Sequence, residues 1–115
     1  MYNYNLLDPE KCDFFTIASI GELVNGERLF VEIGSDDIVV FNIGGDYYAI
    51  ADYCSHDDGP LGDGEVNDHT VACPRHGARF DLRTGAVLSF PAVEDIPAYP
   101  VRVRDGMIEV GVPKE

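Results

Sequence analysis

Two short clusters of cysteine and histidine are the residues of this chain best suited to chemistry. The first spans residues 54–56 (C-S-H) and the second spans residues 73–77 (C-P-R-H-G), with sixteen residues between His56 and Cys73. Thiolate sulfur and imidazole nitrogen both bind transition metals. Because two such pairs on two loops can converge on one point, the spacing predicts a single metal centre. Its candidate ligands are Cys54, His56, Cys73 and His76.

The donor set narrows the choice of metal. Two thiolates and two imidazoles suit tetrahedral zinc, and a structural zinc module is therefore one interpretation. Zinc fingers, however, usually pair cysteine with cysteine and place both histidines on a helix, whereas each cluster here holds one of each and no helix is predicted. A [2Fe–2S] cluster with two chemically different irons fits better, because the thiolates can bind one iron and the imidazoles the other.

The elements that must position these clusters are predicted to be β-strands. Runs rich in Val, Ile, Phe and Tyr alternate with Gly, Asp, Asn and Pro, which is typical of short strands and turns. Helical periodicity is limited to a single turn near residues 17–24. The fold class is therefore expected to be all-β, with antiparallel sheets. The predicted strands cover residues 14–20, 28–33, 38–43, 47–51, 70–73, 78–82 and 86–88, followed by a hairpin over 101–110.

The last hairpin can be specified residue by residue. Asp105-Gly106 is a strong signal for a two-residue turn, since both residues tolerate a positive φ. With this turn, Arg102 faces Glu109 as a pair of opposite charges, worth roughly a few tenths of a kcal/mol. The other face of the hairpin is predicted to pack in the core, through Val101, Val103, Ile108 and Val110.

Composition excludes several classes of protein. A chain of 115 residues suits one domain, and a hydrophobic content of 45% argues against disorder. The formal charge of −13 excludes nonspecific binding to nucleic acid or to an anionic membrane, which requires the opposite sign. No apolar run approaches the ~18 residues of a transmembrane helix, and residues 1–7 lack the basic and apolar segments of a signal peptide. A cytoplasmic location is expected.

The remaining cysteine and histidine are not expected to take part in the site. Three cysteines are an odd number for a disulfide framework, so metal ligation or an unpaired thiol is the preferred interpretation. Cys12 is expected to be a stray thiol in a flexible lead-in, without a redox role. His69 ends a polar segment that starts at Val66 and is predicted to be an exposed turn residue rather than a ligand.

The two clusters resemble the signature of the Rieske proteins, in which C-x-H is followed by a spacer of this size and by C-x-x-H-G. The resemblance continues outside the ligands. Leu61 stands where the first loop of that family covers the cluster with a hydrophobic residue, and residues 76–85 follow the family pattern after the second loop. Phe90-Pro91 is similar to the third loop, which contains a proline. The similarity covers roughly residues 14–112.

The resemblance implies a fold and a division of the chain. A Rieske-type fold has antiparallel sheets that form a base subdomain, and a smaller cluster-binding subdomain inserted into it. We expect the cluster-binding subdomain at about residues 53–92 of a single domain that spans residues 14–112. Residues 1–13 are then an N-terminal lead-in and residues 113–115 a C-terminal tail.

The resemblance also implies roles for individual residues around one Rieske-type [2Fe–2S] cluster. Cys54 and Cys73 would bind the inner iron through sulfur, and His56 and His76 would each bind the outer iron through one ring nitrogen. The other ring nitrogens would face the surface, where partner proteins dock. The residues expected to surround the cluster are Leu61, Pro74, Gly77, Ala78, Phe80 and Pro91.

Departures from the high-potential branch of the family indicate which branch this chain resembles. High-potential members have an extra cysteine in each loop, joined as a disulfide, whereas the matching positions here hold Gly59 and Arg75. Those members also place a serine and a tyrosine hydroxyl against the cluster sulfurs, where this chain has Ala78 and Phe80. The acidic pair at residues 57–58 would further oppose an added negative charge, whereas the positive charges of Arg75 and Arg79 would favour it. The chain therefore resembles the soluble, low-potential ferredoxins.

A ferredoxin of this type is implied to be a one-electron carrier and not an enzyme on its own. Its expected partners are an NAD(P)H-dependent flavin reductase and the terminal non-haem iron component of a ring-hydroxylating oxygenase. The chain is expected to be a monomer. Two other interpretations share these ligands or this fold: a protein similar to the small subunit of nitrite reductase, and a ferredoxin linked to iron–sulfur assembly.

Overall fold

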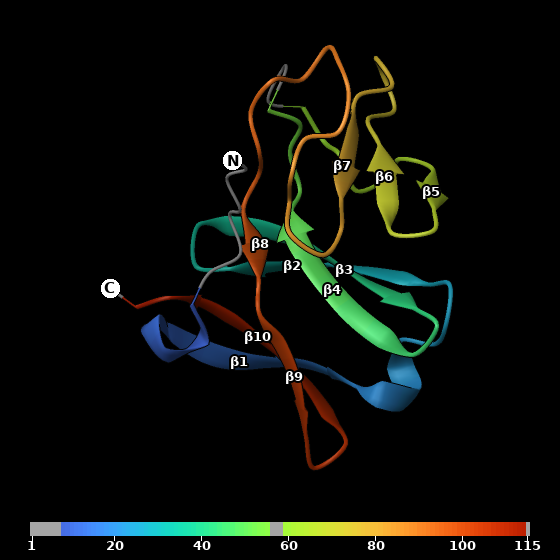
Figure 1. Ribbon diagram of the computed structural model, residues 1–115. Coiled ribbons are helices and arrows are strands. Elements are labelled where there is room, and N and C mark those ends of the chain that lie inside the picture. The colour runs from blue at the N-terminus through green and yellow to red at the C-terminus, as the bar shows by residue number, and fades with distance from the viewer. Residues whose placement is uncertain (1–7, 56–58, 115) are drawn as a thin grey trace.

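Three antiparallel sheets form the fold. The computed structural model describes residues 8–55 and 59–114, and these residues form no α-helix. Two of the sheets make the lower part of the molecule, and the third lies above them with long loops (Figure 1). The all-β expectation is confirmed. His56 and the acidic pair at residues 57–58 lie outside the described residues.

The first sheet joins the two ends of the described chain. It has the order β1-β10-β9. β1 (Cys12–Ser19) pairs with β10 (Met107–Pro113), and Cys12 stands opposite Pro113. β9 (Val101–Arg104) forms the outer edge of this sheet. Two 3₁₀ turns flank β1, η1 (Pro9–Lys11) and η2 (Ile20–Glu22), and the second corresponds to the helical turn predicted near residues 17–24.

The hairpin of β9 and β10 has the register that the turn predicted. Arg102 stands opposite Glu109, and their side chains form an ion pair at 2.5 Å. Ile108 is fully buried, as predicted for the core face. The prediction is wrong for Val103, which is 49% exposed although it lies opposite Ile108. Val103 lies two residues before the Asp105-Gly106 turn and does not reach the core that contains Ile108, whereas Val101 of the same strand packs against it.

The second sheet separates two hydrophobic cores. Its order is β2-β3-β4-β8, with β2 (Arg28–Ile33), β3 (Asp36–Ile43), β4 (Asp46–Ala51) and β8 (Ala98–Tyr99). Successive side chains of a strand point to opposite faces. In β3, Val39 and Phe41 therefore pack in the upper core, while Ile38 and Val40 pack in the lower core against β10. β3 therefore contributes side chains both to the core of the base and to the core beneath the upper loops.

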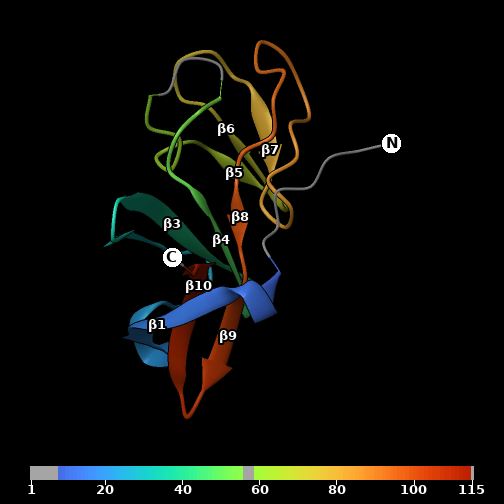
Figure 2. The same ribbon diagram turned by 90° about the vertical axis from the view of Figure 1, so that its left-hand side faces the viewer.

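The third sheet is small and lies in the upper part of the molecule. It consists of β5 (Val66–Asn67), β6 (Thr70–Ala72) and β7 (Arg79–Asp81) in that order. β4 and β8 rise side by side from the base towards these strands and their loops (Figures 1 and 2). The whole sheet falls within residues 53–92, where the smaller subdomain is expected.

Three sequence-based expectations differ from the structure at the level of elements. The prediction that Cys12 lies in a flexible lead-in is wrong. Cys12 is 6% exposed and begins β1, because its backbone pairs with that of β10. Pro113, expected in the tail, ends β10. Residues 86–88 form no strand but a single bridge, between Val87 and Phe80.

Candidate metal centre

The two described candidate cysteines lie in one hydrophobic core at the upper end of the molecule. Cys54 follows β4 and is 0% exposed, and Cys73 follows β6 and is 2% exposed. None of the three cysteines of the chain is in a disulfide. The structure thus brings Cys54 and Cys73 into a common apolar environment from two separate strands. The fully buried members of this core include Leu61, Ala78 and Phe80.

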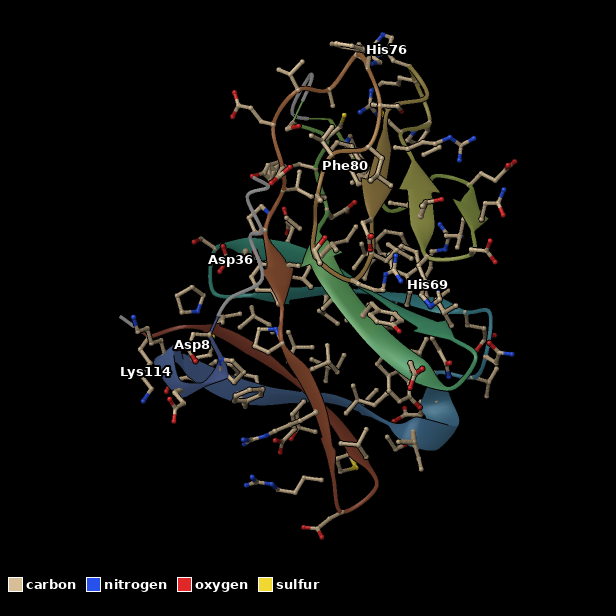
Figure 3. All side chains as sticks on the ribbon, in the orientation of Figure 1. Asp8, Asp36, His69, His76, Phe80 and Lys114 are labelled. Carbon is tan, nitrogen blue, oxygen red and sulfur yellow. The ribbon has the colours of Figure 1, made fainter. Side chains whose placement is uncertain are left out.

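The second loop is closed by short hydrogen bonds within itself. The Cys73 amide donates to the Ala78 carbonyl at 2.7 Å, and the Gly77 amide donates to the Cys73 carbonyl at 2.9 Å. Gly77 has φ +77°, a conformation that favours glycine. This tight loop leaves His76 exposed at the outer extremity of the molecule, with Phe80 below it (Figure 3). His76 is therefore accessible, as the resemblance implied.

The first loop is attached to its own base and to residue 94. The Cys54 amide donates to the Gly59 carbonyl at 2.8 Å, so these residues close the loop that contains His56. The Ser55 hydroxyl donates to the Glu94 carbonyl at 2.5 Å. Below, one carboxylate oxygen of Asp52 accepts the Leu61 amide at 3.1 Å and the Gly62 amide at 2.6 Å. These bonds fix Leu61 in the core beside Cys54.

The third loop, residues 87–93, presents apolar side chains to solvent. Phe90 is 81% exposed, Val93 is 69% exposed and Leu88 is 50% exposed. The loop is held from β7, because the Leu88 amide donates to the Arg79 carbonyl at 2.7 Å and the Ser89 hydroxyl accepts the Arg79 amide at 3.0 Å. This loop, orange in Figure 1, therefore presents apolar residues at the same end of the molecule at which Figure 3 shows His76.

The comparison with known proteins identifies the family to which this arrangement belongs. The family model of the Rieske [2Fe-2S] domain matches residues 13–100. The chain belongs to the Rieske [2Fe-2S] domain family. This membership implies a Rieske-type [2Fe–2S] cluster as the cofactor.

Several proteins that resemble this chain are named as ferredoxins of dioxygenase systems. The 3-phenylpropionate/cinnamic acid dioxygenase ferredoxin subunit of Escherichia coli K12 is 40% identical over 83% of this chain and 90% of its own length. The ferredoxin of carbazole 1,9a-dioxygenase from Nocardioides aromaticivorans IC177 is 32% identical, with a TM-score of 0.81 over 88% of this chain and 98% of that one. A chain in the complex of reduced oxygenase and oxidised ferredoxin of carbazole 1,9a-dioxygenase is 25% identical, with a TM-score of 0.81 over 89% of this chain and 95% of its own.

The described residues fit a Rieske cluster in the chemistry of their donors. Cys54 and Cys73 offer sulfur in an apolar core, and His76 offers an imidazole on the loop that starts at Cys73. Within residues 8–55 and 59–114, no three His, Cys, Asp or Glu side chains converge as a metal site. The fourth member of the expected set, His56, lies outside this part of the chain.

The residues expected around the Rieske cluster divide into buried and exposed groups. Leu61, Ala78 and Phe80 are 0% exposed. Pro91 is half-buried, and the Phe90-Pro91 peptide bond is cis. Pro74 and Gly77 are exposed on the loop beside His76.

His69 is separate from the Rieske site. It lies at the opposite end of β6 from Cys73 (Figure 3). Its ring makes an edge-to-face contact with Tyr48, with 5.5 Å between the ring centroids. The prediction of a turn position is correct, but the residue is half-buried rather than exposed because it packs against that ring. Burial alone would raise the pKa of the nearby Asp81, but hydrogen bonds from Arg83 outweigh it and hold that pKa below its usual value.

Sequence reasoning predicted the two loops and their donor residues but missed one contact between these loops. Arg75 was interpreted only as a nearby positive charge. In the structure its guanidinium donates to the Pro60 carbonyl at 3.0 Å and reaches the Cys73 sulfur at 3.5 Å.

No helix of the described chain combines the length and apolar character needed to cross a membrane.

Proposed function

We propose that the chain is the ferredoxin component of a ring-hydroxylating dioxygenase system and works in the cytoplasm. It carries single electrons from an NAD(P)H-dependent flavin reductase to a terminal non-haem iron oxygenase. The observation that carries this proposal is the burial of Cys54 and Cys73 in one core directly beneath a loop that exposes His76. The function named for the relatives, ferredoxin subunits of dioxygenases, supports it.

We assign Cys54 and Cys73 to one iron and His56 and His76 to the other. A Rieske cluster supplies reversible uptake of one electron. The chain's own residues would supply the surroundings of that step. The buried Leu61, Ala78 and Phe80 keep water away from the two sulfurs, and the exposed second loop leaves the imidazole of His76 at the surface.

We further propose that both partners dock at the end of the molecule that carries His76. Electron transfer requires a short path, and the exposed loop offers the shortest path to a cluster held there. The apolar side chains of Phe90 and Val93 lie at this end and would make the desolvated contact with the oxygenase. Because one small surface cannot hold two proteins at once, the ferredoxin would shuttle between them.

The chain is proposed to act as a carrier without turnover of its own. Its function is tested by reconstitution with the candidate flavin reductases and terminal oxygenases of the same organism. Product formation from NAD(P)H should require the wild-type chain and should be lost with Cys73→Ser. A chain that takes up an electron from dithionite, but supports no product with either partner at any ratio, would contradict the proposed pathway.

A further inference from the structure

One arginine joins the two loops that carry the cysteines. Nη1 of Arg75 donates to the carbonyl oxygen of Pro60 at 3.0 Å, and Nη2 donates to the sulfur of Cys73 at 3.5 Å. Pro60 belongs to the first loop, and Arg75 belongs to the second. The guanidinium therefore spans the gap between loops that are fifteen residues apart in the chain.

The first loop leaves space for this guanidinium. Gly59 lies against it so closely that a Cβ there would be 2.5 Å from Nη2 and 2.6 Å from Cζ of Arg75. The carbonyl of Gly59 also accepts the Cys54 amide at 2.8 Å. One side chain thus contacts the Cys73 sulfur and the segment that closes the loop of Cys54.

We infer that Arg75 is a positioning residue that clamps the first loop to the second and stabilises the negative charge on the Cys73 sulfur. This inference rests on the proposed ligation of the cluster by both cysteines. A guanidinium is a rigid, planar fork that remains charged, so it can donate to two acceptors in fixed directions. A hydrogen bond from a charged donor to a ligand sulfur favours the reduced, more negative state.

Arg79, the first residue of β7 after the loop of Arg75, provides the matched comparison. It is exposed on β7, and its two hydrogen bonds to the third loop use backbone atoms, as described above. Its guanidinium therefore contributes a positive charge near the loops without a bond to Cys73. A difference in iron release or midpoint potential between variants at residues 75 and 79 therefore reports the hydrogen bonds of Arg75, and not merely the loss of one positive charge.

Iron release to a chelator tests the clamp without any partner protein. Arg75→Gln should lose its visible absorbance roughly tenfold faster than wild type, as expected for a lost charged hydrogen bond. Gly59→Ala should also be faster, because its methyl group displaces the guanidinium while the charge remains. Arg79→Gln should match wild type. Gly21→Ala, where a Cβ meets nothing within 4 Å, is the control for the glycine change.

The double variant Gly59→Ala/Arg75→Gln distinguishes one shared contact from two independent effects. Both changes remove the same contact, so the double variant should release iron no faster than the faster single variant. Release rates that multiply in the double variant would contradict the clamp. If Arg75→Gln acquires no cluster at all while Arg79→Gln does, and both unfold cooperatively, the clamp is supported.

The midpoint potential provides a second readout that a purely structural role would not change. Arg75→Gln should have a lower midpoint potential than Arg79→Gln. Arg75→Lys should restore the midpoint potential more fully than it restores the slow release of iron, because lysine keeps the positive charge but cannot donate to both acceptors in the geometry of a guanidinium. Equal potentials and equal release rates in Arg75→Gln and Arg79→Gln would overturn the inference. Because no reductase or oxygenase is used, that result would leave the proposed electron-transfer pathway intact.

Discussion

The amide of Cys73 and the carbonyl of Ala78 are joined by a hydrogen bond of 2.7 Å, which closes the loop that exposes His76. Ala78 itself is fully buried in the core that contains both candidate cysteines, and so is Phe80 two residues later. Neither side chain carries a hydroxyl group. The two buried side chains that follow this loop therefore offer the sulfurs no hydrogen bond, and the described side chain that donates to the Cys73 sulfur is that of Arg75.

A low midpoint potential follows from these two side chains. Fewer donors to the sulfurs stabilise the reduced cluster less, so the midpoint should lie near about −150 mV, the low end of the Rieske range. Ala78→Ser and Phe80→Tyr should each raise it. Spectroelectrochemical titration measures the shift, with Ala86→Ser as a control outside the core. A wild-type midpoint near the upper end of the range, or no rise in either variant, would refute the hydrogen-bond argument.

The ligand assignment predicts a sharp contrast among the three cysteines. Cys54→Ser or Cys73→Ser should abolish or grossly perturb the visible spectrum, since metal binding also holds the two loops together. His56→Ala and His76→Ala should do the same. The β9–β10 hairpin should survive in these variants, which far-UV circular dichroism would verify.

Cys12→Ser is the control for that series. Cys12 is 6% exposed and lies on β1, away from the loops, so the variant should keep the wild-type spectrum. Burial of a hydroxyl in place of a thiol should lower the free energy of unfolding by roughly 1 kcal/mol. A lost spectrum in Cys12→Ser, or an intact one in Cys73→Ser, would show that the ligands are wrongly assigned.

Long elements with strong local signals could be predicted from the sequence, and short ones could not. The strand over residues 28–33 and the register of the last hairpin are correct, because period-two patterning and the Asp105-Gly106 turn act within a few residues. β5 and β8 contain two residues each and therefore show no periodicity. β8 exists because it pairs with β4, which is a tertiary contact that a local pattern does not contain.

The candidate site divides in the same way. The loops of Cys54 and Cys73 are evident in the sequence because ligand types and spacing are local properties. The bridge from Arg75 to Pro60 is not, since it depends on how two loops meet in space. A signal for it existed in the sequence, because Gly59 and Arg75 stand at the two positions where the resemblance places the disulfide cysteines of the high-potential Rieske proteins.

The net charge of −13 predicts that encounters with a basic partner depend on salt. Reduction by the cognate reductase should slow as ionic strength rises, because the Debye length falls from about 30 Å at 0.01 M to about 10 Å at 0.1 M. Charge reversal near the site should slow it further. Glu94 is a suitable position, since its carbonyl accepts the hydroxyl of Ser55 beside Cys54.

Stopped-flow reduction across a salt series measures this steering. Glu94→Lys should be slower than Glu32→Lys, which reverses an exposed carboxylate on β2 in the base. The same comparison with Asp57→Lys or Asp58→Lys tests the acidic pair that follows His56 in the sequence. Rates that ignore salt and do not differ between these variants would mean that the charge has another role.

Asn42 should be important for stability but not for potential. It is 4% exposed, its amide nitrogen donates to the Leu23 carbonyl at 2.8 Å, and its oxygen accepts the Gly45 amide at 2.9 Å. Asn42→Ala leaves buried polar groups unpaired and should lower the free energy of unfolding by about 1–3 kcal/mol. Urea denaturation measures this loss. A shifted midpoint potential in this variant would mean that the base and the site are coupled more tightly than the contacts indicate.

The electron paramagnetic resonance spectrum of the dithionite-reduced protein tests the central assignment most directly. Ligation of one iron by two imidazoles and the other by two thiolates predicts a Rieske spectrum, whose average g-value is lower than that of an all-cysteine [2Fe–2S] ferredoxin. The reduced chain should show that spectrum, and Cys73→Ser should not. A colourless protein without a signal, or a signal with the average g-value of an all-cysteine cluster, would contradict the assignment.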